Sequence, residues 1–489
     1  MTVVATKTKT FRNIAYASFG KVITLICVAA TSSVVARNLS PSDYGVLGFA
    51  GIIIAFLGHF SDVGIGSAAI RRPSLDEKDL DTAFTLKIVL SFGAFIIAFL
   101  VAPFAHHVFA HPAIGNVIRV VAANFLISCI GFMPTVVLSR EQNFRALSKP
   151  QIAGAIVRCF VAIGLVLHGW KYWAVVLADL MATLTTGLVM QWSRKMPLRL
   201  HFDPAVTREY LRFGMPLFGT GLLVFSLFNM DNFLIGSKMG ADKLGYYALA
   251  FTWGSFVCVL LADTVNSVLL PAFSAIQNDL AAMRRWYLKT VDLGGFVAVV
   301  GNTALLANAH LFLVTFLGKG SAKWIPAALS LELLCLYGII RALTEPLGNC
   351  IMASGHTGLL LRSNTLAGIV EVVLILSVLR FGRIDLVAGS VLIAYATQAM
   401  VYLPYVRRSM GITAGEMGGL LWPLIPAIVG GYAFTQLIPD SLGGTIVTLA
   451  GRGVFTMLVT ALIHGLCTRF RCLQEARGMV LQNFARLRA

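Results

Sequence analysis

The sequence predicts an all-α polytopic membrane protein: about fourteen transmembrane helices in two six-helix bundles plus two extra C-terminal helices. Of its 489 residues, 57% are hydrophobic and only 12% are charged, and the mean hydropathy is +0.80. Soluble proteins carry about 25% charged residues, so this composition excludes an aqueous globular domain. Apolar runs long enough to cross a bilayer recur along the chain, and two stretches, 39–45 and 240–247, look like copies of one another.

Fourteen apolar runs reach the roughly 20 residues that a transmembrane helix needs. The first follows a basic, hydroxyl-rich N-terminus and is too long for the apolar core of a signal peptide. The longest polar gaps, 193–211 and 277–289, are too short to fold alone. The predicted segments are 14–36, 44–70, 82–104, 115–138, 150–168, 171–192, 212–236, 244–272, 290–317, 326–353, 358–379, 384–406, 419–438 and 445–467.

The net charge of +17 is explained by membrane topology. With the N-terminus in the cytoplasm, 28 of the 39 Lys and Arg residues fall on the cytoplasmic side and nine in the opposite loops, as expected for short loops of membrane proteins. No basic patch is interleaved with aromatic residues outside the apolar segments, so nucleic acid is not an expected partner. The eight Cys residues form no C-x-x-C pair, and we expect neither a metal nor a cofactor.

A duplication is indicated by the turns L-S-P-S-D-Y-G (39–45) and G-A-D-K-L-G-Y-Y (240–247). Gly245 lies 200 residues after Gly45, and Asp263 lies 201 residues after Asp62. Because six helices per copy is an even number, the copies share one orientation and are related by a pseudo-twofold axis along the membrane normal. The expected domains are an N-lobe with helices 1–6 (1–195), a C-lobe with helices 7–12 (196–410), and helices 13–14 with a basic cytoplasmic tail (411–489).

Polar residues inside the segments are candidate functional residues, because a charge in hydrocarbon is costly. Asp231, with Asn229 beside it, either faces a substrate cavity or reaches the interface or a lysine. Asn266 in the eighth segment is a further cavity candidate. Asp62 and Asp263 occupy matched positions of the repeat, which favours pairing with a basic cytoplasmic loop over an ion-coupling role.

Three further candidates lie in the second copy. Arg341 and Glu345 are spaced i, i+4 on one helix face, which favours a structural ion pair. The alternative is that Arg341, with Arg119 or Arg158, holds an anionic head group, since the planar guanidinium bonds phosphate bidentately, and that Glu345 couples to an ion. Glu371 is isolated in its segment and is either a proton or Na⁺ site or a carboxyl kept protonated by burial.

Signals for an enzyme are weak. The chain contains neither G-x-x-x-x-G-K-[ST] nor H-E-x-x-H. His106, His107 and His111 cluster in one loop, where the pattern favours a solvated loop over a metal site. A membrane glycosyltransferase or polymerase is the alternative of another class, but the external loops are too short to carry its catalytic groups.

The chain resembles the polysaccharide transporter (Wzx-type flippase) family of the superfamily that also holds the multidrug and toxin extruders and the lipid II flippase. The resemblance spans most of residues 10–410, and each motif is short while their order and spacing are specific. The motifs are the turn at 39–45, D-x-G at 62–64, L-S-R-E-Q-N-F-R at 138–145, N-M-D-N-F-L-I-G at 229–236 with L-G-Y-Y at 244–247, and Pro346 with A-S-G at 353–355.

The resemblance implies a flippase in the bacterial inner (cytoplasmic) membrane, with both termini cytoplasmic. It would move undecaprenyl-pyrophosphate-linked oligosaccharide repeat units across the membrane lipids by alternating access, for exopolysaccharide, capsule or O-antigen biosynthesis. The runner-up is a cation-coupled drug or small-molecule exporter of the same superfamily. The sequence leaves open the sugar, the coupling ion, and whether a polysaccharide polymerase and a chain-length regulator act beside the protein.

Overall fold

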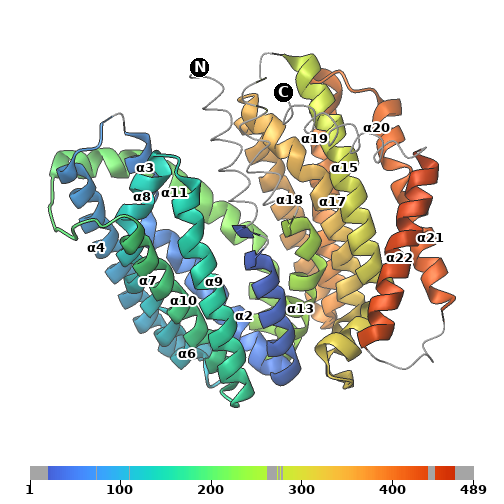
Figure 1. Cartoon of the computed structure of the whole chain (residues 1–489), viewed down its shortest axis with the longest axis horizontal. Helices are drawn as coiled ribbons and strands as arrows, with labels where there is room; N and C mark the ends of the chain where they lie inside the picture. Colours follow the sequence, from blue (N-terminus) through green and yellow to red (C-terminus); the bar gives the residue numbers. More distant parts are fainter. Residues whose placement is uncertain are drawn as a thin grey trace, which may run out of the picture. The chain divides into compact units, whose positions relative to one another are not determined.

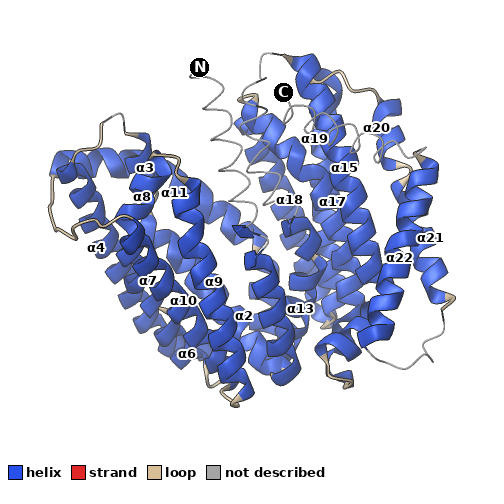
Figure 2. Ribbon diagram, in the orientation of Figure 1, coloured by secondary structure: helices blue, strands red, loops and turns tan. Residues whose placement is uncertain are grey.

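The computed structural model describes residues 20–21, 23–72, 74–109, 111–260, 273, 276, 279–438 and 446–468. Within these ranges every regular element is helical and no strand occurs (Figure 2). Twelve of the described helices are long and apolar enough to cross a membrane, and a shorter apolar helix spans Ile23–Asn38. The prediction of an all-α, multi-pass membrane protein is therefore confirmed.

The chain divides into two compact units, Met1–Ala248 and Leu249–Ala489. The predicted domains, 1–195, 196–410 and 411–489, are defined by a sequence repeat. A division by compactness does not test a repeat, so these domains stay a prediction. The helices of the first unit are α2 (Pro41–Asp62), α3 (Ile65–Arg71), α4 (Glu77–Val101), η1 (Ala102–Phe104), α5 (Ala105–Val108), α6 (Ile114–Val121), α7 (Ala123–Ser128), η2 (Cys129–Gly131), α8 (Phe132–Arg140), α9 (Phe144–Leu167), α10 (Lys171–Ser193), α11 (Pro204–Phe228) and α12 (Met230–Met239), followed by α13 (Ala241–Gly254).

In the second unit α15, α17 and α19 run side by side (Figure 1). Two further helices, α21 and α22, pack on α15 and correspond to the predicted segments thirteen and fourteen. The described elements are α15 (Leu280–Ala307), α16 (Ala309–Leu311), the π-helix η3 (Phe312–Leu317), η4 (Ala322–Ala327), α17 (Ala328–Ala353), α18 (Thr357–Val378), η5 (Leu379–Phe381), α19 (Ile384–Ser409), α20 (Ala414–Leu421), α21 (Leu424–Gln436) and α22 (Ile446–Cys467).

Some predicted segments are interrupted in ways that hydropathy does not reveal, and two of the breaks adjoin candidate site residues. The seventh, expected to be one helix over 212–236, breaks at Asn229, whose φ of −125° and ψ of 8° leave the helical region. The Asn229 side chain donates to the Phe225 carbonyl at 2.9 Å, a local bond that competes with the helix ladder. The second, expected over 44–70, breaks after Asp62, where Val63 (φ 44°) and Gly64 (φ 72°) are both left-handed. Each break ends one helix and redirects the next.

The duplicated turns meet each other in the first unit. A Cβ atom on Gly45 would lie 2.0 Å from the carbonyl oxygen of Ala241, and one on Gly245 would lie 1.9 Å from that of Pro41. Each glycine thus touches the residue that precedes the other glycine by four positions. This reciprocal contact explains why both copies of the turn carry glycine: any side chain would push α2 and α13 apart.

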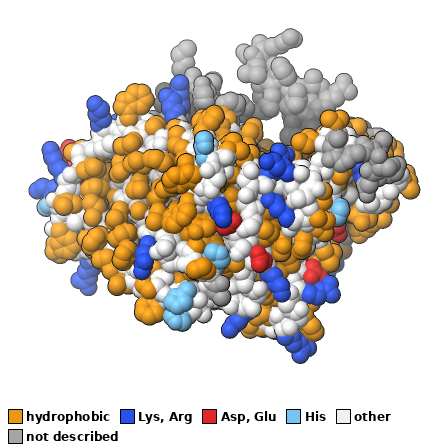
Figure 3. Space-filling view, turned by 90° about the horizontal axis from the view of Figure 1, so that it is seen from below, with side chains coloured by type: hydrophobic (Ala, Val, Ile, Leu, Met, Phe, Trp, Pro, Cys, Tyr) orange, Lys and Arg blue, Asp and Glu red, His pale blue; other side chains and the backbone are white. Residues whose placement is uncertain are grey.

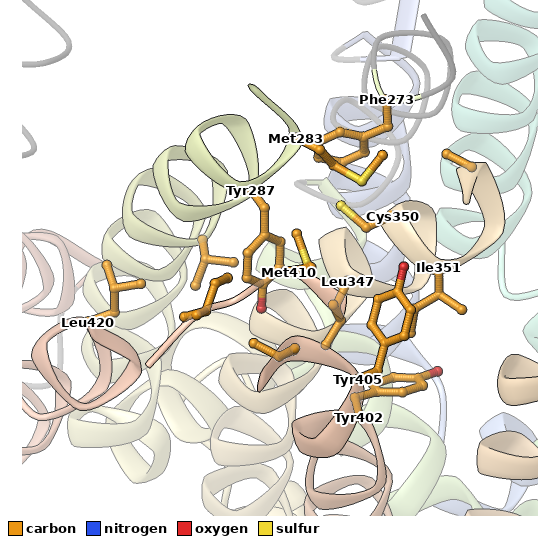
Figure 4. Close-up of a cluster of buried hydrophobic side chains, with 14 residues drawn as sticks. Phe273, Met283, Tyr287, Leu347, Cys350, Ile351, Tyr402, Tyr405, Met410 and Leu420 are labelled. Carbon is orange, nitrogen blue, oxygen red and sulfur yellow. The ribbon is translucent and has the colours of Figure 1, made fainter. Parts of the chain in front are cut away.

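The apolar surface of the helices is extensive. Figure 3 shows hydrophobic side chains over wide areas of one face, between scattered basic residues. Phe160, Trp192 and Val447 are 75%, 78% and 80% exposed, a pattern that water does not favour and lipid does. The buried side is as apolar: Figure 4 shows Tyr287, Leu347 and Tyr405 in a cluster that joins α15, α17 and α19.

Candidate functional site

A polar cluster on α17 contains two of the predicted site residues. Nε of Arg341 lies 3.1 Å from Oε1 of Glu345, as the i, i+4 spacing predicts. Nη1 of Arg341 also donates to the hydroxyl of Tyr337, at 3.0 Å. The side chains of Arg341 and Glu345 are 28% and 30% exposed, so the pair is reachable from outside the unit's core. A guanidinium with further donors and an accessible edge can bind an anion without leaving its carboxylate partner.

Neighbouring helices connect this pair to Glu371. The ring of Tyr337 packs edge-on against the ring of Tyr395 of α19, with centroids 4.6 Å apart at 84°. Glu371 of α18 is 2% exposed and is close enough to Tyr395 to interact with it electrostatically. Arg341 and Glu371, predicted from separate stretches of sequence, thus each interact with one of two tyrosines that pack together, and Glu345 pairs with Arg341.

Sequence reasoning missed the α19 side of this cluster. Gln398 donates to the Asn364 side chain of α18 and, at 3.4 Å, to the hydroxyl of Tyr402. Tyr395, Gln398 and Tyr402 follow one another at spacings of three and four, so they share one face of α19. That spacing is visible in the sequence, but none of the three side chains is charged, so intramembrane charge does not mark this face.

Asp231 of the first unit is held in a different way. It is 1% exposed, Oδ2 accepts a bond of 2.6 Å from the Tyr247 hydroxyl, and Oδ1 accepts one of 3.0 Å from Asn232. It lies in the first turn of α12, where the helix dipole favours a negative charge. In the described part of the chain no lysine forms an ion pair with Asp231. The structure therefore lacks the lysine pair that was one of the predicted alternatives.

Asp62 ends α2 beside Lys87 of α4. Nζ of Lys87 donates to the Ser61 carbonyl at 3.0 Å and lies 3.3 Å from the Ser61 hydroxyl. Lys87 is 7% exposed and feels the charge of Asp62. The Lys87 ammonium thus satisfies an open carbonyl at the end of α2. The matched carboxylate Asp263 and the cavity candidate Asn266 lie outside the described residues.

The two arginines proposed to act with Arg341 lie in the first unit. Arg158 of α9 forms an ion pair with Asp179 of α10. Arg119 of α6 donates to Asn116 at 3.4 Å and stacks over the Phe99 ring at 5.2 Å. Arg119 also lines a pocket of about 410 Å³ together with His106 and His111. Because Arg341 belongs to the other unit, a joint role with either arginine stays a prediction.

The fold is similar to that of a class of solved membrane transporters. The lipid II flippase MurJ, in an inward closed conformation, matches with a TM-score of 0.74 at 13% identity, over 93% of this chain and 98% of that one. An inward-facing multidrug resistance MATE family transporter of the MOP superfamily matches with a TM-score of 0.63 at 15% identity, over 79% of this chain and 94% of that one. At such identities the likeness shows the fold alone, and the fold is the one these transporters share.

Sequence similarity identifies the family within this class. A family model described as "Polysaccharide biosynthesis protein" matches residues 34–328. Lipopolysaccharide biosynthesis protein WzxC of Escherichia coli (strain K12) is 22% identical over 442 residues, 89% of each chain. Succinoglycan biosynthesis transport protein ExoT of Rhizobium meliloti (strain 1021) is 23% identical over 55% of this chain and 54% of that one. The chain belongs to the polysaccharide biosynthesis protein family, and its resemblance to polysaccharide transporters of the MOP superfamily is confirmed.

Proposed function

We propose that the protein is a flippase that moves undecaprenyl-pyrophosphate-linked oligosaccharide repeat units across the bacterial inner membrane, with both termini in the cytoplasm. Family membership supports polysaccharide biosynthesis as the pathway, and the fold supports transport rather than a membrane glycosyltransferase or polymerase. The observation that carries the proposal is Arg341. It is an accessible guanidinium inside an apolar helix bundle, and such a group suits a phosphate head group.

The accessible Arg341 guanidinium also disfavours the alternative function, a cation-coupled drug exporter. A cation-coupled drug exporter needs an anionic site. The accessible Arg341–Glu345 ion pair has no net charge, and its positive group is on the longer of the two side chains. Near that pair, Gln398 and Asn364 bond to each other and add polar side chains to an apolar helix bundle. The accessible guanidinium of Arg341 is therefore the group that favours a phosphorylated substrate.

Deletion of the gene tests the function. In a strain that lacks the protein, lipid-linked repeat units should accumulate on the cytoplasmic side of the membrane, and surface polysaccharide should fall. Accessibility of the accumulated units to an added, membrane-impermeant glycosidase distinguishes the two leaflets. Normal surface polysaccharide in a strain without a paralogue would contradict the proposal. Repeating the glycosidase assay in strains that lack the polymerase or the chain-length regulator decides whether either protein is needed for flipping.

We further propose Glu371 as the coupling group, because it is a carboxyl buried in the cluster that contains Arg341. Protonation of Glu371 would change its electrostatic interaction with Tyr395. Tyr395 packs on Tyr337, which accepts a hydrogen bond from Arg341, so the change could reach Arg341. In Glu371→Gln, flipping by reconstituted protein should no longer respond to an imposed proton gradient, while flipping without the gradient continues. A gradient response equal to that of wild type would remove Glu371 from this role and leave Glu345, Asp62 and Asp263 as candidates.

A further inference from the structure

A basic pocket lies at one end of the first unit, between α3 and α11. It has a volume of about 450 Å³ and is lined by Ala68, Arg71, Arg72, Glu209, Tyr210, Arg212 and Phe213. Small-molecule sites in proteins occupy about 300–1,000 Å³. The lining thus brings three guanidinium groups and one carboxylate to a space of ligand size.

The charge of this pocket is only partly compensated. Nη1 of Arg72 lies 3.1 Å from Oδ1 of Asp79 and 3.7 Å from Oε2 of Glu209, so this arginine is paired. Arg71 and Arg212 form no ion pair with any carboxylate in the described part of the chain. Both are exposed, so their donors are free to bind an anion.

Arg71 is also held in place. Its guanidinium lies over the ring of Phe213, 4.6 Å from the centroid, which leaves the edge with its N–H groups open. Arg140 donates from Nη1 to the carbonyl of Arg72, which fixes the chain at the end of α3 and adds another positive charge nearby. A guanidinium that is already oriented loses less entropy when it binds a ligand.

The fold builds this pocket through a second close glycine contact. The left-handed Gly64 turns the chain out of α2, and a Cβ on Gly214 of α11 would lie 2.1 Å from the carbonyl oxygen of Val63. This approach sets α3 against α11, so that Arg71 at the end of one helix reaches Phe213 beside Arg212 on the other. The helix break after Asp62, which hydropathy does not predict, thus helps to form this pocket.

We propose that this pocket binds the phosphate or pyrophosphate group of a lipid at the face of the membrane where α3 ends, with Arg71 and Arg212 as the binding residues. Their planar guanidinium groups can each donate two parallel hydrogen bonds to phosphate oxygens. The proposal depends on the proposed function only for the source of the phosphate. That source is either the substrate's lipid pyrophosphate, before entry to the transport path, or an anionic phospholipid.

The second unit contains a matched control. A pocket of about 340 Å³ is lined by Arg285, Lys289, Asp292 and Glu416, with Leu288, Gly419 and Leu420. Its charges balance, and Glu416 already forms an ion pair with Arg284. Arg285→Gln/Lys289→Gln therefore removes two basic residues from a comparable pocket without removing a free pair of guanidiniums.

The experiment measures binding to the purified full-length protein. Titration of inorganic pyrophosphate into protein in a zwitterionic detergent measures binding of the phosphate groups that both candidate lipids share. We expect Arg71→Gln/Arg212→Gln to weaken binding by about tenfold or more, since charge-assisted hydrogen bonds are lost, and the control pair to bind like wild type. Arg212→Gln alone is the second variant, because its exposed guanidinium makes no ion pair in the described structure and its loss leaves the packing of Arg71 intact.

Nanodiscs of phosphatidylcholine assign the source. One set contains a few per cent of polyprenyl pyrophosphate and the other the same amount of phosphatidylglycerol, and crosslinking or native mass spectrometry counts bound lipid. Preference for either lipid that is lost in Arg71→Gln/Arg212→Gln supports the site and identifies its ligand. Binding that the double variant and Arg212→Gln leave unchanged, or equal loss in the control pair, overturns the proposal. These readouts need no transport, so they stand apart from the deletion test of flipping.

Discussion

Asp231 in the first unit and Arg341 in the second each put an ionisable group inside an apolar helix, and their surroundings differ. Asp231 is 1% exposed, and both of its oxygens accept hydrogen bonds from within the unit. Arg341 leaves 28% of its side chain exposed. A buried group whose bonds are all made internally stabilises a fold, whereas a group with donors to spare can bind something else. The comparison suggests that Asp231 serves structure and Arg341 serves transport.

The largest effect should come from the packing that surrounds Asp231. Gly245→Leu would place side-chain atoms where the Pro41 carbonyl lies, 1.9 Å from the position of a Cβ. We expect a loss of about 3 kcal/mol or more in stability, since neither helix backbone can yield cheaply. Folded yield and size-exclusion behaviour in detergent report this. Gly51→Leu on α2, the helix that contains Pro41, places its Cβ where nothing lies within 4 Å and is the control. Equal yields from the two variants would contradict this account of the turn.

Arg341→Ala should separate transport from folding. Expression and thermal stability should stay near wild type, while export falls by about thirtyfold to a hundredfold, as expected when one charged hydrogen bond to a phosphate is lost. Surface polysaccharide per unit of membrane protein measures this. Arg383→Ala is the matched control, because that arginine is 61% exposed and pairs locally with Asp385. Export retained in Arg341→Ala would return the Arg341–Glu345 pair to a structural role.

Asp231→Asn should show the opposite pattern. We expect a loss of about 1–2 kcal/mol in stability, because the amide can accept from only one of the two donors, and export per folded molecule close to wild type. Thermal unfolding in detergent measures the first quantity. Tyr247→Phe removes the other half of the 2.6 Å bond, and the double variant should lose less than the two single losses together. Lost export at unchanged stability would instead make Asp231 a transport residue.

The comparison also shows what could be predicted from the sequence. The all-helical, multi-pass fold and the approximate positions of its described spans follow from segment length and hydropathy, and the Arg341–Glu345 pair follows from local i, i+4 spacing. The helix breaks at Asn229 and Val63 do not, because hydropathy carries no information about φ and ψ. The contact between Tyr337 and Tyr395 depends on how α17 packs on α19, which one sequence does not specify.

The contacts of Lys87 are not predictable from charge counting. The positive-inside rule treats each lysine near a segment end as a loop residue. The structure buries Lys87 against Ser61, where it satisfies the end of a helix that breaks. A lysine six residues into an apolar segment (82–104) was the available signal. Its meaning required knowing that α2 ends beside it.

The smallest expected effect concerns the start of α11, the helix that leads to Asp231. Oδ1 of Asp203 accepts from the backbone N–H groups of Val206 and Ala205, at 3.2 and 2.8 Å, and these bonds hold the pKa of its carboxyl below the ordinary value. The folded protein therefore binds this proton less readily than the unfolded chain does. The stabilisation is complete above the ordinary pKa of aspartate and is lost as the pH falls through the lower folded value. Asp203→Ala should lower the unfolding temperature slightly at neutral pH, and the difference from wild type should vanish in acid. A difference that persists at low pH would mean that the side chain stabilises α11 by packing rather than by accepting hydrogen bonds from the N–H groups at the start of the helix.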